Sequence, residues 1–179
     1  MSALETATFG SGCFWCSEAV FSELIGVSKV EPGYSGGNAP NPSYEQVCTD
    51  STGHAEVAQV TFDPKAVSYR ELLEVFFSTH DPTTLNRQGA DEGSQYRSAI
   101  FYQSEEQRKE AEAIIKELTD DRTFKNPIVT QLSEMKAFYP AEEYHKDYYR
   151  RNPGKPYCQV VIAPKLAKFR SHFQQKLKK

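Results

Sequence analysis

The sequence lacks the features that mark several special classes of protein. No apolar run approaches the ~20 residues that a membrane-spanning helix needs. Residues 1–5 show neither the basic nor the apolar region of a signal peptide. There is also no internal repeat and no low-complexity tract. These absences predict a protein that does not bind a membrane, and we take the cytoplasm as its default location.

Cysteine and tryptophan are scarce. Four cysteines among 179 residues are too few for a disulfide scaffold, so in a reducing cytosol we expect them to be catalytic, metal-binding or buried. Two of them, Cys13 and Cys16, flank the only tryptophan, Trp15. This clustering makes residues 13–16 the first candidate for a functional site.

Acidic residues are absent from the last part of the chain. After Asp147 every acidic or basic residue is basic, although the whole chain carries a net charge of −3. The overall charge argues against a nucleic-acid-binding protein. The basic end predicts a solvent-exposed face on a last helix, where cations suit the helix dipole, with a docking face for an acidic partner as the alternative.

What is present is an ordinary globular composition, with 39% hydrophobic and 25% charged residues. Residues 1–179 are enough for a single domain with its own core. Patterns of apolar residues predict strands at 7–9, 27–30, 57–62, 98–102 and 128–132. Helices are predicted after Cys13, at 69–80 behind a capping box that starts at Ser68, and at 104–118, 141–150 and 164–177.

Two long segments between these elements, 32–42 and 83–95, are rich in turn-forming residues, and we expect them to be loops. Residues 157–163 are expected to be extended or irregular. Strands and helices alternate without the regular order of a doubly wound sheet, so we predict an α+β fold. It would be a single-domain two-layer sandwich with a ferredoxin-like, or split βαβ, core, long loops and an irregular C-terminal segment that ends in a helix.

Cys13 is the strongest candidate for a reactive group. It follows a short strand and three small residues and precedes a helical pattern, which places it at a helix N-terminus. Unpaired N–H groups and the helix dipole favour a negative charge there. We therefore predict that Cys13 ionises more easily than a free thiol and acts as a nucleophile. The adjacent Phe14 and Trp15 indicate a pocket for a small apolar group.

A thiolate that removes an oxygen atom from its substrate needs a proton donor, and Glu56 is the best candidate. It opens a predicted strand within an apolar stretch, where a carboxyl has a raised pKa and stays protonated near neutral pH. Tyr44, Asp91 and Tyr96 lie in or beside the two long loops. Phenol hydroxyl groups there can donate hydrogen bonds to a developing oxyanion.

Oxygen transfer would leave Cys13 as a sulfenic acid, which condenses with a nearby thiol to form a disulfide. Cys16 lies one helical turn away from Cys13. Cys158 lies in a segment, beginning at Gly154, that we expect to be loose enough to swing a thiol inward. Cys48, next to an apolar valine, is predicted to be buried and structural.

A series of motifs resembles the A-type peptide methionine sulfoxide reductases, enzymes that restore oxidised methionine. The match covers nearly the whole chain and comprises GCFWC (12–16), GYSGG (33–37), NPSY (41–44), VC (47–48), GHAE (53–56), DEGSQYRS (91–98) and EYH (143–145). The resemblance implies a thiol-dependent oxidoreductase that reduces methionine-S-sulfoxide, free or in oxidised proteins and peptides, and so repairs proteins. It implies a thioredoxin or another dithiol as external reductant, and we expect no bound cofactor, no metal and no nucleic acid, in a monomer.

The resemblance also assigns roles around the thiol. Cys13 corresponds to the nucleophile that attacks the sulfoxide sulfur. Phe14 and Trp15 correspond to the wall that holds the methyl group. Glu56 corresponds to the acid that protonates the sulfoxide oxygen.

Further roles follow in the loops and the tail. Tyr44 and Tyr96 correspond to hydrogen-bonding partners of the sulfoxide oxygen, and Asp91 to a residue that places substrate or water. Many family members have two recycling cysteines in the tail, whereas this chain has only Cys158 there, and it has Cys16 where many members have glycine. We expect Cys158 to resolve the sulfenic acid, with Cys16 as the alternative.

Two other classes of protein remain as alternatives. A cysteine hydrolase would need His54 or His80 within hydrogen-bond reach of Cys13. His80 lies on the apolar stripe of its helix, which favours a buried core histidine. A zinc-binding module would use Cys13 and Cys16 together with Cys48 and His54, although the spacing of the second pair is irregular.

Overall fold

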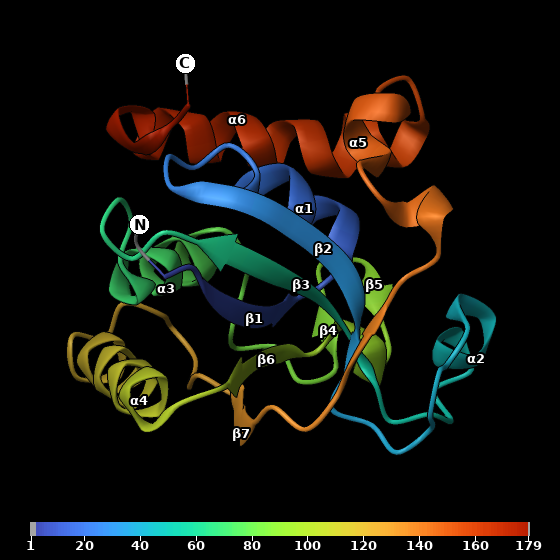
Figure 1. Cartoon of the computed structure of the whole chain (residues 1–179), viewed down its shortest axis with the longest axis horizontal. Helices are drawn as coiled ribbons and strands as arrows, with labels where there is room; N and C mark the ends of the chain where they lie inside the picture. Colours follow the sequence, from blue (N-terminus) through green and yellow to red (C-terminus); the bar gives the residue numbers. More distant parts are fainter. Residues whose placement is uncertain (1–2, 179) are drawn as a thin grey trace.

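The computed structural model describes residues 3–178, and a curled six-stranded sheet lies at its centre (Figure 1). The strand order is β7-β6-β1-β3-β2-β8, and every neighbouring pair is antiparallel except β6 and β7. The bounds are Glu5–Ser11 (β1), Val27–Ser35 (β2), Ala55–Phe62 (β3), Ser98–Tyr102 (β6), Gln131–Glu134 (β7) and Phe138–Pro140 (β8). A separate hairpin consists of Arg87–Gln88 (β4) and Asp91–Glu92 (β5). Residues 1, 2 and 179 lie outside the described residues. All three belong to the domain predicted over residues 1–179, and residues 1 and 2 also belong to the N-terminal segment 1–5.

Helices pack mainly on one face of this sheet and give a mixed α and β architecture. The α-helices span Phe14–Phe21 (α1), Tyr44–Cys48 (α2), Tyr69–Ser78 (α3), Glu105–Asp120 (α4), Tyr148–Arg151 (α5) and Ala163–His172 (α6). Shorter turns are 3-10 helices at Ser94–Tyr96, Glu143–His145 and Gln174–Lys176, and a π-helix at Cys158–Ile162. Figure 1 shows α6 beside α1, whereas α2 lies apart from the other helices. No helix in residues 3–178 is long and apolar enough to cross a membrane.

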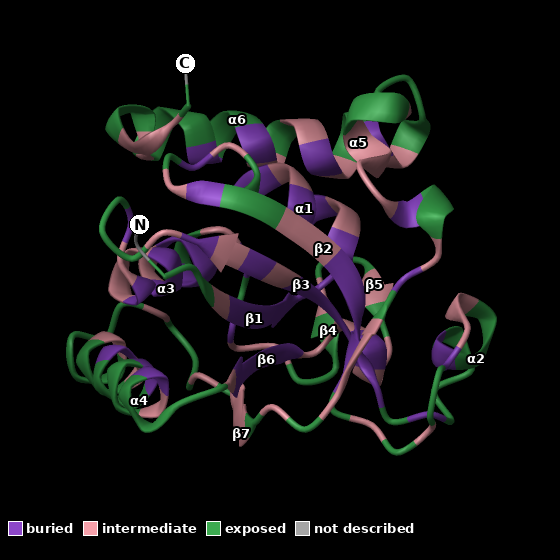
Figure 2. Cartoon of the chain, viewed as in Figure 1, coloured by how far each residue is buried: buried purple, intermediate pink, exposed green. Residues whose placement is uncertain are grey.

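The main core lies between the helices and one face of the sheet. Ala7 and Phe9 of β1 and Val60 of β3 point to this face and pack with buried residues of α1, α3, α4 and α6. Phe9 stacks on Phe21 of α1 and Phe76 of α3, with ring centroids 5.4 and 5.1 Å apart. Figure 2 shows most of β1 and β6 buried and the outer side of α4 exposed. Glu56, in the same row of β3 as Val60, continues this buried face.

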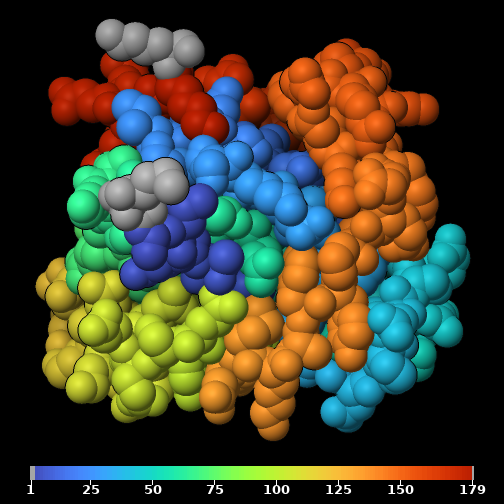
Figure 3. All heavy atoms as spheres, viewed as in Figure 1, coloured from blue at the N-terminus to red at the C-terminus, as the bar shows by residue number. Residues whose placement is uncertain are grey.

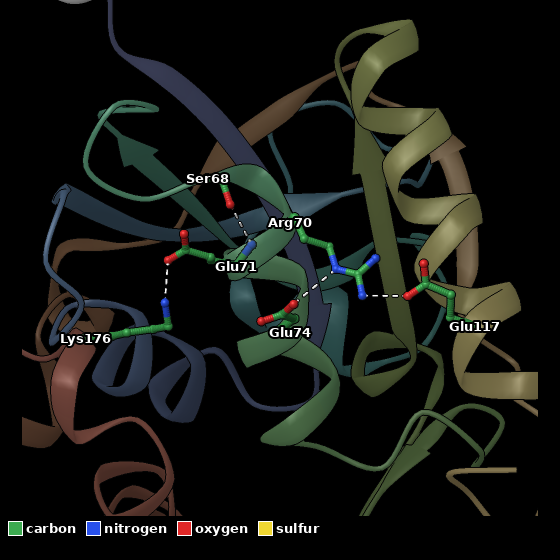
Figure 4. A network of polar contacts seen from close by, with 6 residues as sticks. All are labelled: Ser68, Arg70, Glu71, Glu74, Glu117 and Lys176. Atoms are coloured by element: carbon green, nitrogen blue, oxygen red, sulfur yellow. Dashed lines mark hydrogen bonds and ion pairs between the residues drawn. The ribbon is translucent and has the colours of Figure 1, made fainter. Parts of the chain in front are cut away.

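Polar contacts fix α3 to the elements beside it (Figure 4). The hydroxyl of Ser68 accepts the N–H of Glu71 at 3.0 Å, which confirms the predicted start of the helix. The Glu71 carboxylate pairs with Lys176 near the C-terminus at 2.7 Å. Arg70 pairs with Glu74 of α3 and Glu117 of α4. Such exposed ion pairs each stabilise a fold by only ~0–1 kcal/mol. These pairs therefore orient α3, and its buried face supplies most of the stabilisation.

Most predicted strands and helices are confirmed, but the first predicted loop begins too early. Residues 32–35 belong to β2 and continue its pairing with β3, with Pro32 opposite Ala58. A proline has no N–H for the ladder, but the carbonyl of Pro32 still accepts the N–H of Ala141 at 2.9 Å. The second predicted loop, 83–95, contains the β4–β5 hairpin and the start of a 3-10 turn. The predicted strand at 128–132 begins later, at Gln131.

The C-terminal part of the chain differs most from the prediction. The expected irregular segment 157–163 is wrong, because Cys158–Ile162 forms a π-helix that runs directly into α6. Three consecutive apolar residues, 160–162, follow neither the 3.6-residue nor the two-residue period, so the sequence pattern did not indicate a helix here. The single helix expected at 141–150 is broken at Asp147, which has a φ of +55°, into a 3-10 turn and α5.

Candidate active site

Cys13 stands at the junction of β1 and α1, where it is the N-cap residue of the helix with φ −59° and ψ 127°. The turn depends on Gly12, which has a φ of +97° and on which a Cβ would approach the Gln88 side chain to 2.7 Å. The Cys13 carbonyl accepts the N–H of Cys16 at 3.1 Å at the start of the helix. The thiol therefore lies at a strand-to-helix junction, as the sequence predicted.

The Cys13 thiol is buried, with an exposed fraction of 8%. Burial raises the pKa of this thiol well above its ordinary value, and the charges of Glu56 and Cys16 add to the rise. Contacts with the backbone N–H of Trp15 and the hydroxyl of Tyr157 oppose it. The prediction of an easily ionised thiol is therefore wrong, because loss of solvent outweighs the helix terminus. The thiol is neutral at rest.

Glu56 lies at the end of β3 that adjoins Cys13. Its carboxyl is 1% exposed, and Oε1 accepts the backbone N–H of Phe14 at 3.1 Å. Burial raises the pKa of Glu56 to about 8, and the charge of Asp91 acts in the same direction, whereas the Phe14 hydrogen bond opposes the rise. The carboxyl is therefore mostly protonated at neutral pH, as its apolar strand position predicted.

Phenol hydroxyl groups lie around the two reactive groups. Burial raises the pKa of both Tyr44 and Tyr96, and for each of them the charge of Glu56 is the next cause. The third phenol, Tyr157, donates its hydroxyl hydrogen to the Asp91 carboxylate at 2.6 Å. All three phenols stay protonated at neutral pH and can act as hydrogen-bond donors. The fold thus gathers the predicted residues of the two long loops around Glu56.

Of the two aromatic residues after Cys13, only Trp15 has exposed surface. Phe14 is fully buried, and its ring packs on Tyr34 at 5.7 Å and on His145 at 5.0 Å. Trp15 is half-buried and stacks on Tyr148 with ring centroids 3.8 Å apart and planes 7° apart. Its indole Nε1–H donates to His145 Nδ1 at 3.0 Å. The apolar wall near Cys13 is therefore mainly the indole, with Phe14 behind it.

His145 and Tyr148 belong to a stretch, residues 141–162, that we call the C-terminal cover. Its residues pack on α1 and on the thiols, from Ala141 beside Phe14 to Ile162 beside the cysteines. Figure 3 shows the chain that leads into it, in orange, running over the surface between β2 and α2. The cover closes one side of the site.

Three of the four free thiols share one buried cluster: Cys13, Cys16 and Cys158. The charge of Cys16 helps to raise the pKa of Cys13, and that of Cys158 helps to raise the pKa of Cys16. Cys16 therefore lies within electrostatic reach of both other thiols. Cys158 is fully buried at the start of the π-helix and already lies in the cluster with the other two thiols, so no inward swing of the segment from Gly154 is needed to bring it there. The prediction of a buried Cys48 is wrong, because Val47 takes the buried position at the end of α2.

Sequence reasoning missed three residues of this site. Tyr157 contacts Cys13 and donates its hydroxyl hydrogen to the Asp91 carboxylate. Glu142 accepts the hydroxyl of Tyr34 and the backbone N–H of Tyr44, each at 2.9 Å. His145 accepts the indole N–H. None of them lies in a periodic pattern, and the only signal was the EYH motif at 143–145.

The two candidate histidines of a cysteine hydrolase are occupied elsewhere. Nδ1 of His54 accepts a backbone N–H, and Nε2 lies 2.7 Å from a backbone carbonyl oxygen. His80 lies 2.5 Å from a carbonyl oxygen of α3 and 2.8 Å from a serine hydroxyl. Their partners are Gly37, Ala39, Phe76 and Ser98. Burial lowers the pKa of His80 to about 4, so it is the neutral core histidine that the sequence predicted.

The alternative zinc module is not assembled either. Cys13 and Cys16 lie in the buried cluster, whereas Cys48 is exposed on α2 and His54 is bonded to the loop backbone. In the part of the chain that the structure describes, no three His, Cys, Asp or Glu side chains are grouped to hold a metal ion.

The site therefore combines a neutral thiol, a neutral carboxylic acid, phenol donors and an indole, with two further thiols behind them. A thiol beside a carboxylic acid can accept an oxygen atom at sulfur while the acid supplies a proton. The neighbouring thiols can then convert the sulfenic acid into a disulfide. This is reductive chemistry on an oxidised, apolar group.

Comparisons with known proteins agree with this chemistry. A family model described as peptide methionine sulfoxide reductase matches residues 5–177. The chain is 58% identical over 173 residues to peptide methionine sulfoxide reductase MsrA of Sulfolobus acidocaldarius, which covers 97% of each chain. Mxr1 of Saccharomyces cerevisiae in its reduced form superposes with a TM-score of 0.78 and 37% identity, over 87% of this chain and 89% of that one. Mxr1 in complex with Trx2 superposes with a TM-score of 0.55 and 27% identity, over 81% and 84% of the two chains.

Proposed function

The chain belongs to the peptide methionine sulfoxide reductase family, and from this membership we propose how its residues perform the reaction. The protein is a thiol-dependent peptide-methionine (S)-S-oxide reductase, which returns oxidised methionine to methionine. The proposed roles rest on one observation. The buried, protonated carboxyl of Glu56 accepts the N–H of Phe14 and so shares the helix N-terminus with the Cys13 thiol.

In the first step, Glu56 protonates the sulfoxide oxygen while the sulfur of Cys13 attacks the sulfoxide sulfur. Protonation makes the substrate sulfur more positive, which favours loss of the thiol proton at the moment of attack. That proton restores the Glu56 carboxyl. The protonated oxygen then moves from the substrate sulfur to the Cys13 sulfur while the bond between the two sulfurs breaks, so that methionine leaves with its electron pair and Cys13 becomes a sulfenic acid. A thiol that stays neutral at rest is protected from oxidants until a substrate arrives.

The groups around this pair bind and orient the substrate. The hydroxyls of Tyr44 and Tyr96, which lie near the Glu56 carboxyl, donate hydrogen bonds to the sulfoxide oxygen. The Trp15 indole, backed by Phe14, holds the methyl group. Asp91 places substrate or water, and Tyr157 fixes its carboxylate.

In the second step, a thiol condenses with the Cys13 sulfenic acid, which releases water and forms a disulfide. The sequence favoured Cys158 as the resolving thiol, but we propose the alternative, in which Cys16 precedes Cys158 on this route, because Cys16 is the thiol within electrostatic reach of both others. A Cys13–Cys16 disulfide then exchanges with the Cys158 thiol, which leaves Cys13 reduced. The first resolving thiol is thus Cys16, and Cys158 holds the disulfide that the reductant attacks.

An external dithiol completes the cycle. It reduces the protein disulfide to two thiols and becomes a disulfide itself, so that its two electrons replace those that the enzyme gave to the substrate. The solved complex of Mxr1 with Trx2 supports a thioredoxin as this reductant. The substrates are then oxidised proteins, peptides and free methionine sulfoxide, and the enzyme needs no bound cofactor.

The finer architecture is also part of the proposal. The strand order β6-β1-β3-β2, with α1 and α3 as crossover helices, supports a ferredoxin-like, split βαβ core in a two-layer sandwich. The main hydrophobic cluster, which joins this sheet to α1, α3, α4 and α6, supports one catalytic domain over residues 1–179. We take this domain to act as a monomer in the cytoplasm.

A single-turnover assay on fully reduced protein tests the proposed function. Blocked methionine sulfoxide is supplied as separate S and R epimers without reductant, and methionine and free thiols are counted. With one equivalent of sulfoxide per chain, we expect methionine from the S epimer alone, with the loss of two thiols for each methionine formed. The matched variant Cys13→Ser should form none. Methionine from neither epimer, or equal yields from both, would overturn the proposal.

A further inference from the structure

Glu18 is a buried acidic residue of α1 that the proposed reaction does not use. Its exposed fraction is 8%, and it lies among the buried residues of a mostly apolar helix. Its Oε1 accepts the backbone N–H of Asp147 at 2.7 Å, and the N–H of Tyr148 also bonds to its carboxylate. A buried carboxyl costs stability unless it is hydrogen-bonded, and here burial raises the pKa of Glu18 to about 7 while the N–H of Asp147 opposes the rise.

The two N–H groups that Glu18 accepts begin α5. Asp147 has a left-handed backbone, with φ 55° and ψ 34°, and no side chain from α5 itself caps the helix. A residue with a Cβ in this conformation is strained by ~1–2 kcal/mol and persists only where its surroundings hold it. Glu18, which belongs to α1, supplies the missing cap of α5 and stabilises the left-handed backbone of Asp147.

The segment that Glu18 anchors carries both groups that fix the Trp15 indole. Tyr148, next to Asp147, stacks on the indole with the ring centroids 3.8 Å apart. His145, two residues before Asp147, accepts the indole N–H at 3.0 Å. The indole in turn packs on the cluster that contains Cys13. A shift of the start of α5 would therefore move the stacking partner and the hydrogen-bond acceptor of the indole together.

We propose that Glu18 is a positioning residue for the substrate pocket: by anchoring the start of α5 across to α1, it fixes the plane of the Trp15 indole beside Cys13. The inference rests on the proposed function for the role of Trp15 in binding the methyl group. Glu18 itself touches neither the substrate nor the reacting atoms. It acts through Asp147 and Tyr148.

The test compares Glu18→Ala with Glu18→Gln, whose amide oxygen can still accept the Asp147 N–H. Trp15 is the only tryptophan, so intrinsic fluorescence reports on this indole alone. For Glu18→Ala we expect a shifted emission maximum and a KM for the S-sulfoxide raised about tenfold, with kcat within about twofold, because a pocket wall binds substrate and transition state alike. Glu18→Gln should retain most of both properties. The control Glu23→Ala, which removes a carboxylate paired with exposed Arg170, should change neither.

A double-mutant cycle decides whether Glu18 acts through Tyr148. We expect Glu18→Ala to add almost nothing to Tyr148→Ala, whereas independent residues would give additive losses. If Glu18→Ala does not fold, Glu18→Leu fills the same space without an acceptor and takes its place. Unchanged emission and KM in the folded variant, or additive effects in the cycle, would overturn the inference. The emission is read without substrate, so an inactive wild type would refute the proposed function and leave this test intact.

Discussion

Cys13 and Glu56 are held by regular elements, whereas the first part of the C-terminal cover, residues 141–151, is held on α1 mainly by individual side-chain contacts. Cys13 caps α1 directly after β1, and Glu56 lies in the hydrogen-bonded ladder of β3, in register with Tyr34 of β2. Both positions are fixed by backbone geometry and by the core beneath them. The cover depends on the Glu18 carboxylate, the indole N–H of Trp15 and a stack of rings.

This difference separates two tasks. Oxygen transfer needs the thiol and the acid at fixed positions, and regular elements provide that precision. Thiol exchange and reduction by a partner need groups that can move, and segments held by few contacts open at lower free energy than core elements. We therefore expect the site to join a rigid half, which performs the proposed oxygen transfer, and a half that moves more easily, which recycles the thiol.

The sharpest separation of the two halves comes from removing the thiols behind Cys13. The double variant Cys16→Ser, Cys158→Ser should form methionine in its first turnover but lose steady-state activity with thioredoxin completely, because no disulfide can form. Methionine per enzyme, followed over time, measures this. The exposed thiol provides the control, since Cys48→Ser should turn over normally. Sustained turnover by the double variant would contradict the recycling role.

The single variants then give the order of the thiols. In Cys158→Ser, peptide mapping after one turnover should find a Cys13–Cys16 disulfide. In the wild type the Cys16–Cys158 disulfide should dominate. A Cys13–Cys158 disulfide in the wild type would instead mean that Cys158 resolves the sulfenic acid directly.

The buried carboxyl of Glu56 should make the unfolding free energy of the protein depend on pH. The pKa of Glu56 is about 8 in the folded protein and near 4.5 when unfolded, so between these pH values only the unfolded chain loses the proton. Folding is then progressively destabilised as the pH rises from about 4.5 to about 8. Glu56→Gln removes this loss and keeps the acceptor for the Phe14 N–H.

Denaturant unfolding at pH 5 and pH 8 measures this effect. The unfolding free energy of Glu56→Gln, relative to wild type, should rise by ~2–5 kcal/mol between the two pH values. A difference that does not change with pH would mean that Glu56 is ionised in the folded protein at pH 5.

A smaller effect is expected where the two halves meet. Tyr157→Phe removes the hydroxyl that contacts Cys13 and donates to Asp91. One hydrogen bond of ~0.5–1.5 kcal/mol corresponds to a single-turnover rate about three- to tenfold lower. Tyr102→Phe, at the end of β6, is the matched control. A rate equal to that of the control would exclude the Tyr157 hydroxyl from the reaction.

The rigid half could be read from the sequence because its signals are local. Small residues before an apolar helix located Cys13, and an acidic residue in an apolar strand located Glu56. Neither signal could give the balance of burial against the helix terminus, so the direction of the Cys13 pKa shift was wrong. That balance depends on how many distant residues cover the thiol.

The structure of the C-terminal cover could not be predicted from local sequence signals. The run at 160–162 has no helical period, and the left-handed Asp147 has no local marker such as glycine. Nothing near Glu18 in the sequence marks it as buried, because the start of α5 that packs against it lies 129 positions away. Tyr157 becomes recognisable only when the fold brings it to Asp91, which is 66 positions away in the sequence.

The most direct test of the account is the single-turnover rate of Glu56→Gln on the S-sulfoxide, measured by rapid quench beside wild type. If Glu56 is the proton donor, removing its acidic proton should slow methionine formation by ~10²–10⁴-fold, the usual contribution of a general acid. The variant should still fold and should still present the Cys13 thiol. Equal rates for the two proteins would contradict the central claim that a buried carboxylic acid beside Cys13 drives the oxygen transfer.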